Sequence, residues 1–217
     1  MIVAIPPLLM LTTFLVFKSA SKTLGQEMGY LIGFGFYWIF WCLAIPWLLM
    51  GNGLTSLLTN HAPLFRPPNW LAALVWIIIT LVTLVMYGKS FIKAPLTLIL
   101  FAIPLATING ICEEILWRGL YVSIFPENFW LAILYPSIGF ALWHLVPLSI
   151  FSDGNKWKFI LSTFFLGLAY GFIAYKTDSV LWTAVSHSLG GILALSGMLA
   201  PSLLSVVASD SPSNGSE

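Results

Sequence analysis

The feature that most constrains this chain is a series of long apolar runs, several of which approach the length of a membrane span. A helix of about 20 apolar residues crosses the hydrocarbon core of a bilayer, and its backbone groups bond to one another within the helix. The chain is 59% hydrophobic and 8% charged, a composition typical of polytopic membrane proteins. We therefore expect an all-α fold, a polytopic transmembrane helical bundle of about seven to eight helices.

The number of helices depends on how two of the runs are divided. Residues 94–125 and 179–207 are longer than one span needs, and both contain proline. Either run could be a span followed by a helix that lies in the membrane interface. The complete set of apolar runs is 2–17, 29–50, 70–88, 94–125, 129–150, 159–175 and 179–207.

The stretches between the runs are too short to divide domains, so we expect one integral membrane domain over residues 1–208. Residues 209–217 have the polar composition of a disordered tail. A net charge of +1 without a basic cluster gives no reason to propose a nucleic acid as partner, and leaves the lipid bilayer as the expected surroundings. The Gly-x-x-x-Gly spacings at 29–33 and 167–171 favour close helix packing within the chain, and leave the oligomeric state unknown.

Three charged residues interrupt the fourth apolar run. Glu114 and Arg118 are four residues apart on the predicted helix and face each other, whereas Glu113 points about 100° around the helix from them. In a soluble protein the same pattern is an ordinary solvated helix face. Charged groups at bilayer depth are costly and usually mark function. We expect Glu114 and Arg118 to neutralise each other and Glu113 to meet a group from another helix.

Histidines in two later runs are the titratable groups that could meet Glu113. His144 lies in the fifth run and His187 in the seventh. A glutamate and a histidine that converge on one water can orient it and take its proton, and a second histidine can donate to the oxyanion that forms. The same three side chains could instead bind Zn²⁺, with the water in the fourth position. Spacing alone leaves both chemistries open.

These motifs, in this order, resemble the CPBP family of intramembrane endopeptidases, which includes the CAAX prenyl endopeptidases and bacterial Abi or bacteriocin-processing proteins. The resemblance rests on Glu113-Glu114-x-x-x-Arg118, on Phe140-x-x-x-His144 and on the later His187, and it covers about residues 94–195. It implies a peptidase-like core over that range, acting on a membrane-associated protein or peptide.

The resemblance also implies roles for these residues. Glu113 and His144 would activate the water, His187 would help to stabilise the oxyanion, and Glu114 with Arg118 would form a structural pair. Phe140 would be a further supporting residue. The family has been described both as metalloproteases and as glutamic-type proteases. We expect no metal cofactor, because the polar set lacks a second carboxylate or a third imidazole. The alternative is Zn²⁺ bound by Glu113, His144 and His187.

The chain departs from the family at Gly191, where many members carry an asparagine that serves as a second oxyanion donor. Asn109 precedes Glu113 by four residues and shares its helix face, so it is a candidate to fill this role. Two alternatives to catalysis stay open, and the departure at Gly191 supports the first of them. One is a membrane protein that binds a peptide or confers immunity to a bacteriocin without catalysis. The other is a small transporter with a proton relay. Transporters usually show repeated halves, and their absence from this sequence counts against this alternative.

The resemblance and the length of the chain together suggest a place and a task. Because protein prenylation is a eukaryotic process, a short chain of this kind is expected in a prokaryotic cell membrane, as a multi-pass integral protein. There it would remove a leader peptide or a C-terminal sorting anchor from its substrate.

Overall fold

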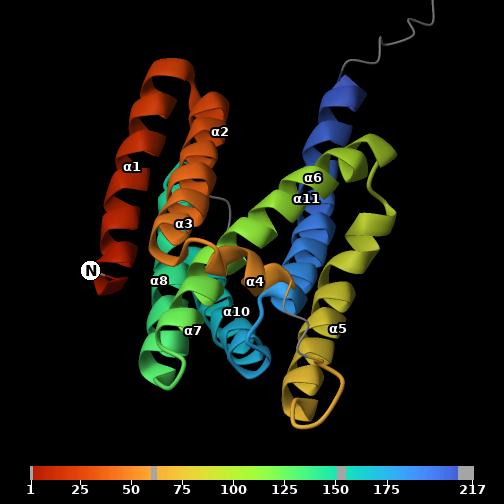
Figure 1. Ribbon diagram of the computed structural model, residues 1–217. Helices are drawn as coiled ribbons and strands as arrows, with labels where there is room; N and C mark the ends of the chain where they lie inside the picture. The colour runs from red at the N-terminus through yellow and green to blue at the C-terminus, as the bar shows by residue number, and fades with distance from the viewer. Residues whose placement is uncertain (1, 60–62, 151–154, 210–217) are drawn as a thin grey trace, which may run out of the picture. The chain divides into compact units, whose positions relative to one another are not determined.

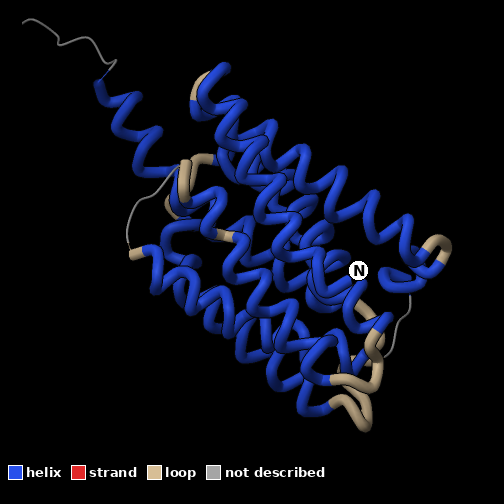
Figure 2. Tube along the Cα trace, turned by 90° about the vertical axis from the view of Figure 1, so that its left-hand side faces the viewer, coloured by secondary structure: helices blue, strands red, loops and turns tan. Residues whose placement is uncertain are grey.

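The structure is a computed structural model that describes residues 2–59, 63–150 and 155–209, with the backbone alone for residues 197–209. Throughout these residues the chain is helical apart from short connections, and no strand occurs among them (Figures 1 and 2). In the part of the chain that the structure describes, six helical stretches are long and apolar enough to cross a membrane, and a shorter apolar stretch follows at Leu181–Ser196. The predicted all-helical, polytopic fold is confirmed.

Several of the spans combine α-helix with segments of wider π-helix. The first two spans are η1 (Ile2–Ala4) with α1 (Ile5–Leu24), and α2 (Gln26–Phe36) with the π segment η2 (Tyr37–Ala44) and α3 (Ile45–Met50). After the short α4 (Gly53–Thr59) come α5 (Trp70–Ile92), then α6 (Leu96–Glu114) with the π segment η3 (Ile115–Leu120) and α7 (Tyr121–Ile124). The remaining elements are the π segment η4 (Trp130–Leu134) with α8 (Tyr135–Trp143) and α9 (Leu145–Leu148), α10 (Lys156–Thr177) and α11 (Leu181–Ser209).

Both overlong runs form continuous helices, so neither consists of a span and a separate interfacial helix. The first is unbroken from Leu96 to Ile124 and contains Pro104, while Pro95 directly precedes its first residue. A proline inside a membrane helix is tolerated where neighbouring groups satisfy the freed carbonyl. The second run is the single helix α11, of which Ser209 is the last residue. The rest of the predicted tail lies outside the described residues.

Some helices extend further than the apolar runs. The first run ends at residue 17, yet α1 continues to Leu24 and includes Lys18 and Lys22, which lie beyond that run. Lys89 is likewise inside α5. Hydropathy marks the part of a helix that lies in hydrocarbon, whereas the helix itself can continue into the interface with its lysine amines in water. A cation in the last turn also interacts favourably with the helix dipole.

The chain divides into two compact units, which are described separately. The first unit comprises Met1–Trp76 and Cys112–Thr183, and the second comprises Ile77–Ile111 and Ala184–Glu217. The boundaries fall inside α5, inside the α6–α7 span and inside α11. The single membrane domain expected over residues 1–208 stays a prediction.

In the first unit, α1 packs along α2 through the first Gly-x-x-x-Gly spacing. A β-carbon placed on Gly33 would lie 2.5 Å from the ring of Phe17, and one on Gly29 would collide with the backbone of Ser21. The two helices are joined at Gly25, whose φ of +91° favours glycine. Close approach of small residues is a main source of helix association in lipid. The predicted packing role of this spacing within the chain is confirmed.

The second Gly-x-x-x-Gly spacing packs α10 against η4 and α8, also within the first unit. A β-carbon on Gly167 would lie 3.1 Å from the Cβ of Ser137, and one on Gly171 would lie 2.8 Å from the Cγ2 of Ile133. The Ser137 hydroxyl donates to the Ile133 carbonyl at 2.6 Å, so it does not oppose the contact with an unsatisfied polar group. This spacing, too, is a helix contact within the chain.

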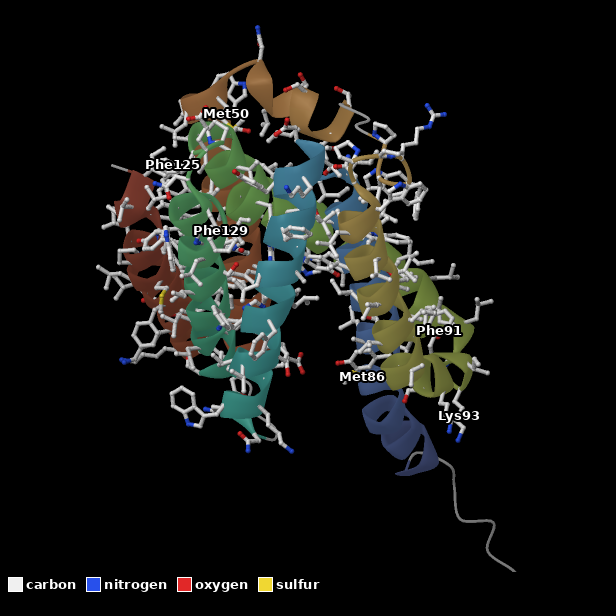
Figure 3. All side chains as sticks on the ribbon, turned by 90° about the horizontal axis from the view of Figure 1, so that it is seen from below. Met50, Met86, Phe91, Lys93, Phe125 and Phe129 are labelled. Atoms are coloured by element: carbon white, nitrogen blue, oxygen red, sulfur yellow. The ribbon has the colours of Figure 1, made fainter. Side chains whose placement is uncertain are left out.

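Large apolar side chains cover much of the outer surface in both units. Phe129 of the first unit is 49% exposed and Met86 of the second is 62% exposed, and both are labelled in Figure 3. A contiguous apolar exterior of this kind would be an aggregation hazard in water, whereas lipid tails can cover it. The interior of the first unit holds tryptophan, tyrosine and phenylalanine rings together with three charged groups.

Candidate active site

The predicted charged cluster lies at the junction of α6 and η3, inside the first unit. Glu113, Glu114 and Arg118 are each at most 1% exposed. Arg118 Nη1 donates to Glu114 Oε1 at 2.8 Å, so the ion pair predicted from the helical spacing is present. Each charge offsets the cost of burying the other, because an unpaired charge at this depth would be far less stable. The π segment η3, which begins directly after Glu114, is a rare form of helix that is often found at functional sites.

Two aromatic rings from other helices contact the Arg118 guanidinium. Its central carbon lies 4.2 Å from the centre of the Phe140 ring on α8 and 5.5 Å from that of Tyr170 on α10. Such cation–π contacts stabilise a cation more strongly when water is excluded. The charge on Arg118 is therefore supported from three helices, by one carboxylate and two ring faces.

His144 lies at the short break between α8 and α9, where Phe140 holds its ring in place. Its Nδ1 is 2.7 Å from the Phe140 carbonyl oxygen, and the two rings meet edge to face with centroids 4.7 Å apart. A carbonyl oxygen can only accept, so Nδ1 must carry the proton. In the neutral imidazole Nε2 is then the acceptor nitrogen, the atom that can take a proton from water or bind a metal ion.

These contacts form one chain from the ion pair to the histidine. Glu114 holds Arg118, Arg118 lies over Phe140, and Phe140 contacts His144 through both its ring and its carbonyl oxygen. The position of Phe140, four residues before His144, is what the Phe-x-x-x-His spacing provides on a helix. A substitution in the ion pair should therefore disturb His144 without touching it.

Glu113 and His144 lie at similar depths in neighbouring spans of the first unit. At the helical rise per residue, Glu113 lies about 17 Å from the end of its span at Ile124, and His144 lies about 21 Å from the start of the next span at Trp130. A short connection joins these two ends. The segment η2 adjoins this part of the span, where the Trp117 indole N–H donates to the Tyr37 hydroxyl at 2.7 Å. Nothing in the sequence indicated that η2 adjoins the predicted site.

Asn109 and His187 belong to the second unit, where α6 and α11 pack closely. Both side chains are half-buried. The residues that directly follow them, Gly110 and Ser188, are in close contact. A β-carbon on Gly110 would lie 2.6 Å from the hydroxyl oxygen and 2.8 Å from the backbone nitrogen of Ser188. The structure thus brings five of the predicted site residues together in the first unit and these two in the second.

The same helix crossing gives a physical reason for the departure at Gly191. A β-carbon placed there would lie 2.9 Å from the Cβ of Ala106 and 3.6 Å from its Cα. An asparagine at this position would require α6 and α11 to separate. The side-chain amide that many family members have at this point therefore cannot be accommodated without a shift of backbone.

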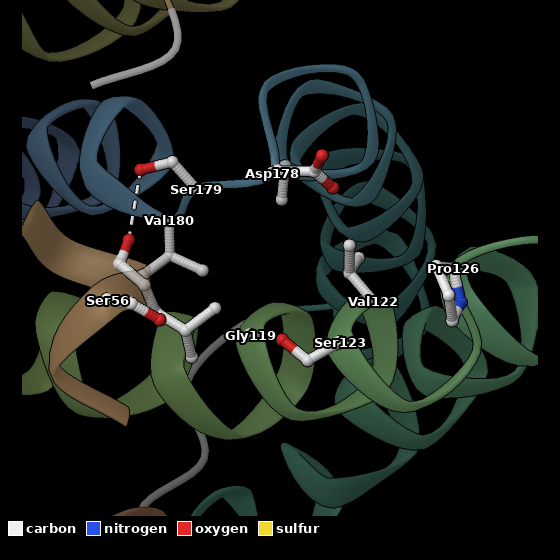
Figure 4. A pocket seen from close by; sticks show the side chains of 10 residues that line it. Ser56, Gly119, Val122, Ser123, Pro126, Asp178, Ser179 and Val180 are labelled. Atoms are coloured by element: carbon white, nitrogen blue, oxygen red, sulfur yellow. Dashed lines mark hydrogen bonds between the residues drawn. The ribbon is translucent and has the colours of Figure 1, made fainter. Parts of the chain in front are cut away.

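A cavity of about 250 Å³ in the first unit was not anticipated from the sequence (Figure 4). It lies next to the connection between α10 and α11, where the Leu57 carbonyl of α4 accepts from the Val180 backbone N–H and the Ser179 hydroxyl, both at 3.0 Å. Its lining includes Gly119, the residue after Arg118. None of the predicted site residues lines it. Only the fold brings α4, α7 and the connection between α10 and α11 to one place.

Part of the chain matches the model of a known protein family. Residues 95–193 match the family model described as type II CAAX prenyl endopeptidase Rce1-like. The matched range contains every predicted site residue of both units. Searches of the curated proteins and of the solved structures found no significant match. Residues 95–193 are therefore similar to the Rce1-like type II CAAX prenyl endopeptidases, in agreement with the resemblance that the sequence motifs carry.

Proposed function

We propose that this protein is an intramembrane endopeptidase in which Glu113 and His144 activate the hydrolytic water and His187 stabilises the oxyanion. The observation that carries the proposal is the contact of His144 Nδ1 with the Phe140 carbonyl oxygen at 2.7 Å. Because Nδ1 donates to the Phe140 carbonyl, Nε2 can receive a hydrogen bond from water. Glu113 is buried at a similar depth, and the neighbouring carboxylate of Glu114 is already bound to Arg118.

The proposed reaction is the hydrolysis of one peptide bond. The water, held by His144 Nε2 and the Glu113 carboxylate, gives a proton to Glu113 as its oxygen attacks the carbonyl carbon of the substrate. His187 donates to the oxyanion of the tetrahedral intermediate. The proton on Glu113 then passes to the leaving nitrogen as the C–N bond breaks, which yields a new carboxylate and a new amine.

Asn109 is proposed as a second oxyanion donor, in place of the asparagine that Gly191 replaces. It lies one helical turn before Glu113 and next to the α6–α11 contact. Loss of one oxyanion donor lowers the rate by about 100- to 1000-fold. An Asn109→Ala variant with the turnover of the wild type would remove this role.

We propose that the reaction proceeds without a metal ion. The donor set also suits Zn²⁺, because a histidine that donates through Nδ1 to a carbonyl is typical of metal sites too. Among the residues that the structure describes, no group of three His, Cys, Asp or Glu side chains is arranged to hold a metal. Treatment with 1,10-phenanthroline should therefore leave turnover unchanged, whereas loss of activity that Zn²⁺ restores would establish a metalloprotease.

The substrate is proposed to be the membrane-proximal part of a small protein or peptide. The family name points to prenylated CAAX proteins. Removal of a leader peptide or of a C-terminal sorting anchor is the task that we favour, and a prokaryotic cell membrane as the location stays a prediction.

Terminal-peptide mass spectrometry of the native host tests the proposed function. Membrane and secreted fractions of the wild type would be compared with those of a chromosomal Glu113→Gln strain. Glutamine keeps the size of the side chain and its hydrogen bonding but cannot take a proton from water. Glu27→Gln is the matched control, because this carboxylate is exposed at the start of α2. We expect an unprocessed precursor to accumulate in the Glu113→Gln strain and not in the control.

The competing function is sequestration of a peptide without catalysis, which would confer immunity. The glycine at position 191 favours it, because the usual second oxyanion donor is missing. Sequestration should tolerate Glu113→Gln. Identical terminal peptides in the wild type and the Glu113→Gln strain, together with a phenotype for the full deletion, would replace the catalytic proposal by this one.

A further inference from the structure

Tyr37 connects the two helices that carry Glu113 and His144. It is the first residue of the π segment η2, and its side chain is fully buried in the first unit. The Trp117 indole N–H donates to the Tyr37 hydroxyl at 2.7 Å, a buried hydrogen bond between residues 80 positions apart. A tyrosine hydroxyl that accepts one bond keeps its own proton for donation.

Trp117 lies one helical turn after Glu113 in the same helical span. Residues four apart on a helix lie on the same face, so the Tyr37–Trp117 bond fixes the face from which Glu113 projects. Loss of this bond would leave the Trp117 indole N–H buried without its acceptor, and an unsatisfied buried donor is strongly unfavourable.

On its other side the Tyr37 ring contacts the residue before His144. Its ring stacks on that of Trp143 with centroids 3.9 Å apart and planes inclined by 20°. The Trp143 ring in turn meets the His144 imidazole, with centroids 5.0 Å apart. Trp143 is completely buried, so the stack has no room to slide without displacing core side chains.

We propose that Tyr37 is a positioning residue that holds Glu113 and His144 at the separation needed to share one water, acting through Trp117 and Trp143. The inference rests on the proposed function, and it adds to the site a residue from the second span, well before the range that the family model matches. Tyr37 itself does not touch the reacting atoms. Its effect should therefore fall on the rate of the bound substrate and not on substrate binding.

The test is a kinetic comparison of purified variants in liposomes, with a fluorogenic peptide copied from the precursor that accumulates in the Glu113→Gln strain. Tyr37→Phe keeps the stacked ring but removes the acceptor for Trp117. Small displacements of catalytic groups lower rates by up to about 100-fold, so we expect kcat to fall by about 10- to 100-fold with KM unchanged.

Tyr121→Phe is the matched control. Tyr121 is also completely buried in the first unit, and its hydroxyl donates to the Ile2 carbonyl at 3.4 Å. The same chemical change there should leave kcat within about twofold of the wild type, since a buried residue outside the site alters stability and not geometry at the reacting atoms. An equal loss of kcat in Tyr121→Phe would show general loosening of the core and overturn the proposal.

A second variant, at Trp117, tests the same hydrogen bond from the donor side. It provides the test alone if Tyr37→Phe does not fold. Trp117→Phe removes the donor, and the Tyr37→Phe/Trp117→Phe double variant should lose no more kcat than either single variant. Additive losses would mean that Tyr37 does not act through Trp117. If Glu113→Gln abolishes cleavage while Tyr37→Phe has the kcat of the wild type, this inference fails alone. If Glu113→Gln cleaves normally, the proposed function itself fails.

Discussion

At the centre of the first unit, three charged side chains lie among large aromatic rings, whereas in the second unit the helices meet at glycine, alanine and serine. The first arrangement requires each charge to have a partner, as Arg118 has in Glu114 and in the Phe140 ring. The second depends on backbone proximity at Gly110 and Gly191. Lipid offers no hydrophobic drive between helices, and these are two different substitutes for it.

The difference shows in what each unit can tolerate. A paired charge in a low-dielectric interior is destabilised when one member is lost, yet the pair can be exchanged for apolar residues. A contact of backbones offers no such exchange, because any added side-chain atom meets main chain that cannot rotate away. Four substitutions test this contrast, from the largest expected effect to the smallest.

Replacing Arg118 by methionine should have the largest effect, because it leaves the Glu114 carboxylate buried without its cation. We expect the free energy of unfolding in mixed micelles to fall by about 3–5 kcal/mol. The Glu114→Met/Arg118→Met double variant should recover most of this loss. Lys158→Met, which removes an exposed cation from α10, is the control and should change stability by less than about 0.5 kcal/mol. A double variant as unstable as Arg118→Met would contradict the pairing explanation.

Introducing the family asparagine as Gly191→Asn should lower the free energy of unfolding by about 1–3 kcal/mol, because its β-carbon would meet Ala106 at 2.9 Å. Ala106→Gly alone measures the cost of a glycine in α6. In the double variant the two effects should not add, since the second change makes room for the first. Strictly additive losses in thermal unfolding would show that the clash is not the cause.

Gly110→Ala should lower stability by about 1–3 kcal/mol, because the added carbon would meet the backbone nitrogen of Ser188 at 2.8 Å. Gly167→Ala in the first unit is the comparison, since its closest neighbour would be the Ser137 Cβ at 3.1 Å. We expect the smaller loss there. The reverse order, measured by unfolding both variants under the same conditions, would show that these β-carbon distances do not determine the cost of the added carbon.

Gly35→Ala should have the smallest effect, and of the opposite sign. A β-carbon on Gly35 would have no neighbour within 4 Å, and the residue lies inside α2. Alanine is preferred to glycine in a helix by about 0.5–1 kcal/mol, so the free energy of unfolding should rise by that amount. A loss of stability here would mean that helix contacts in the first unit extend further than the glycine packing indicates.

The sequence was sufficient to predict contacts that follow from the spacing of residues along one helix. The spacing of Glu114 and Arg118 predicted their ion pair, and the Gly-x-x-x-Gly spacings predicted two helix contacts within the chain. Contacts that depend on a partner from another helix could not be predicted this way. Gly110 has no glycine four residues away, and its role follows only from the placement of Ser188 against it.

The same limit applies to the candidate site. The sequence indicated that Glu113, His144 and His187 carry polar groups in apolar surroundings, and their catalytic roles stay predictions. It gave no sign of Tyr37, because a tyrosine in an apolar run is an ordinary core residue until its neighbours are known. The protonation state of His144 likewise required the distance from Nδ1 to the Phe140 carbonyl oxygen.

The π segment Ile115–Leu120 fixes the length of the chain between the charged cluster and the end of its span. A π-helical turn holds about one residue more than an α-helical turn, so such segments behave as one-residue insertions in an α-helix. Deletion of one residue within it would let a regular α-helix close, and the residues after it would keep nearly the same faces relative to Glu113. A deletion in a regular α-helical part of a span would instead turn every later position by about 100°. Among functional relatives, the loss of one residue from Ile115–Leu120 should therefore be tolerated better than the loss of one residue from an α-helical part of the same span.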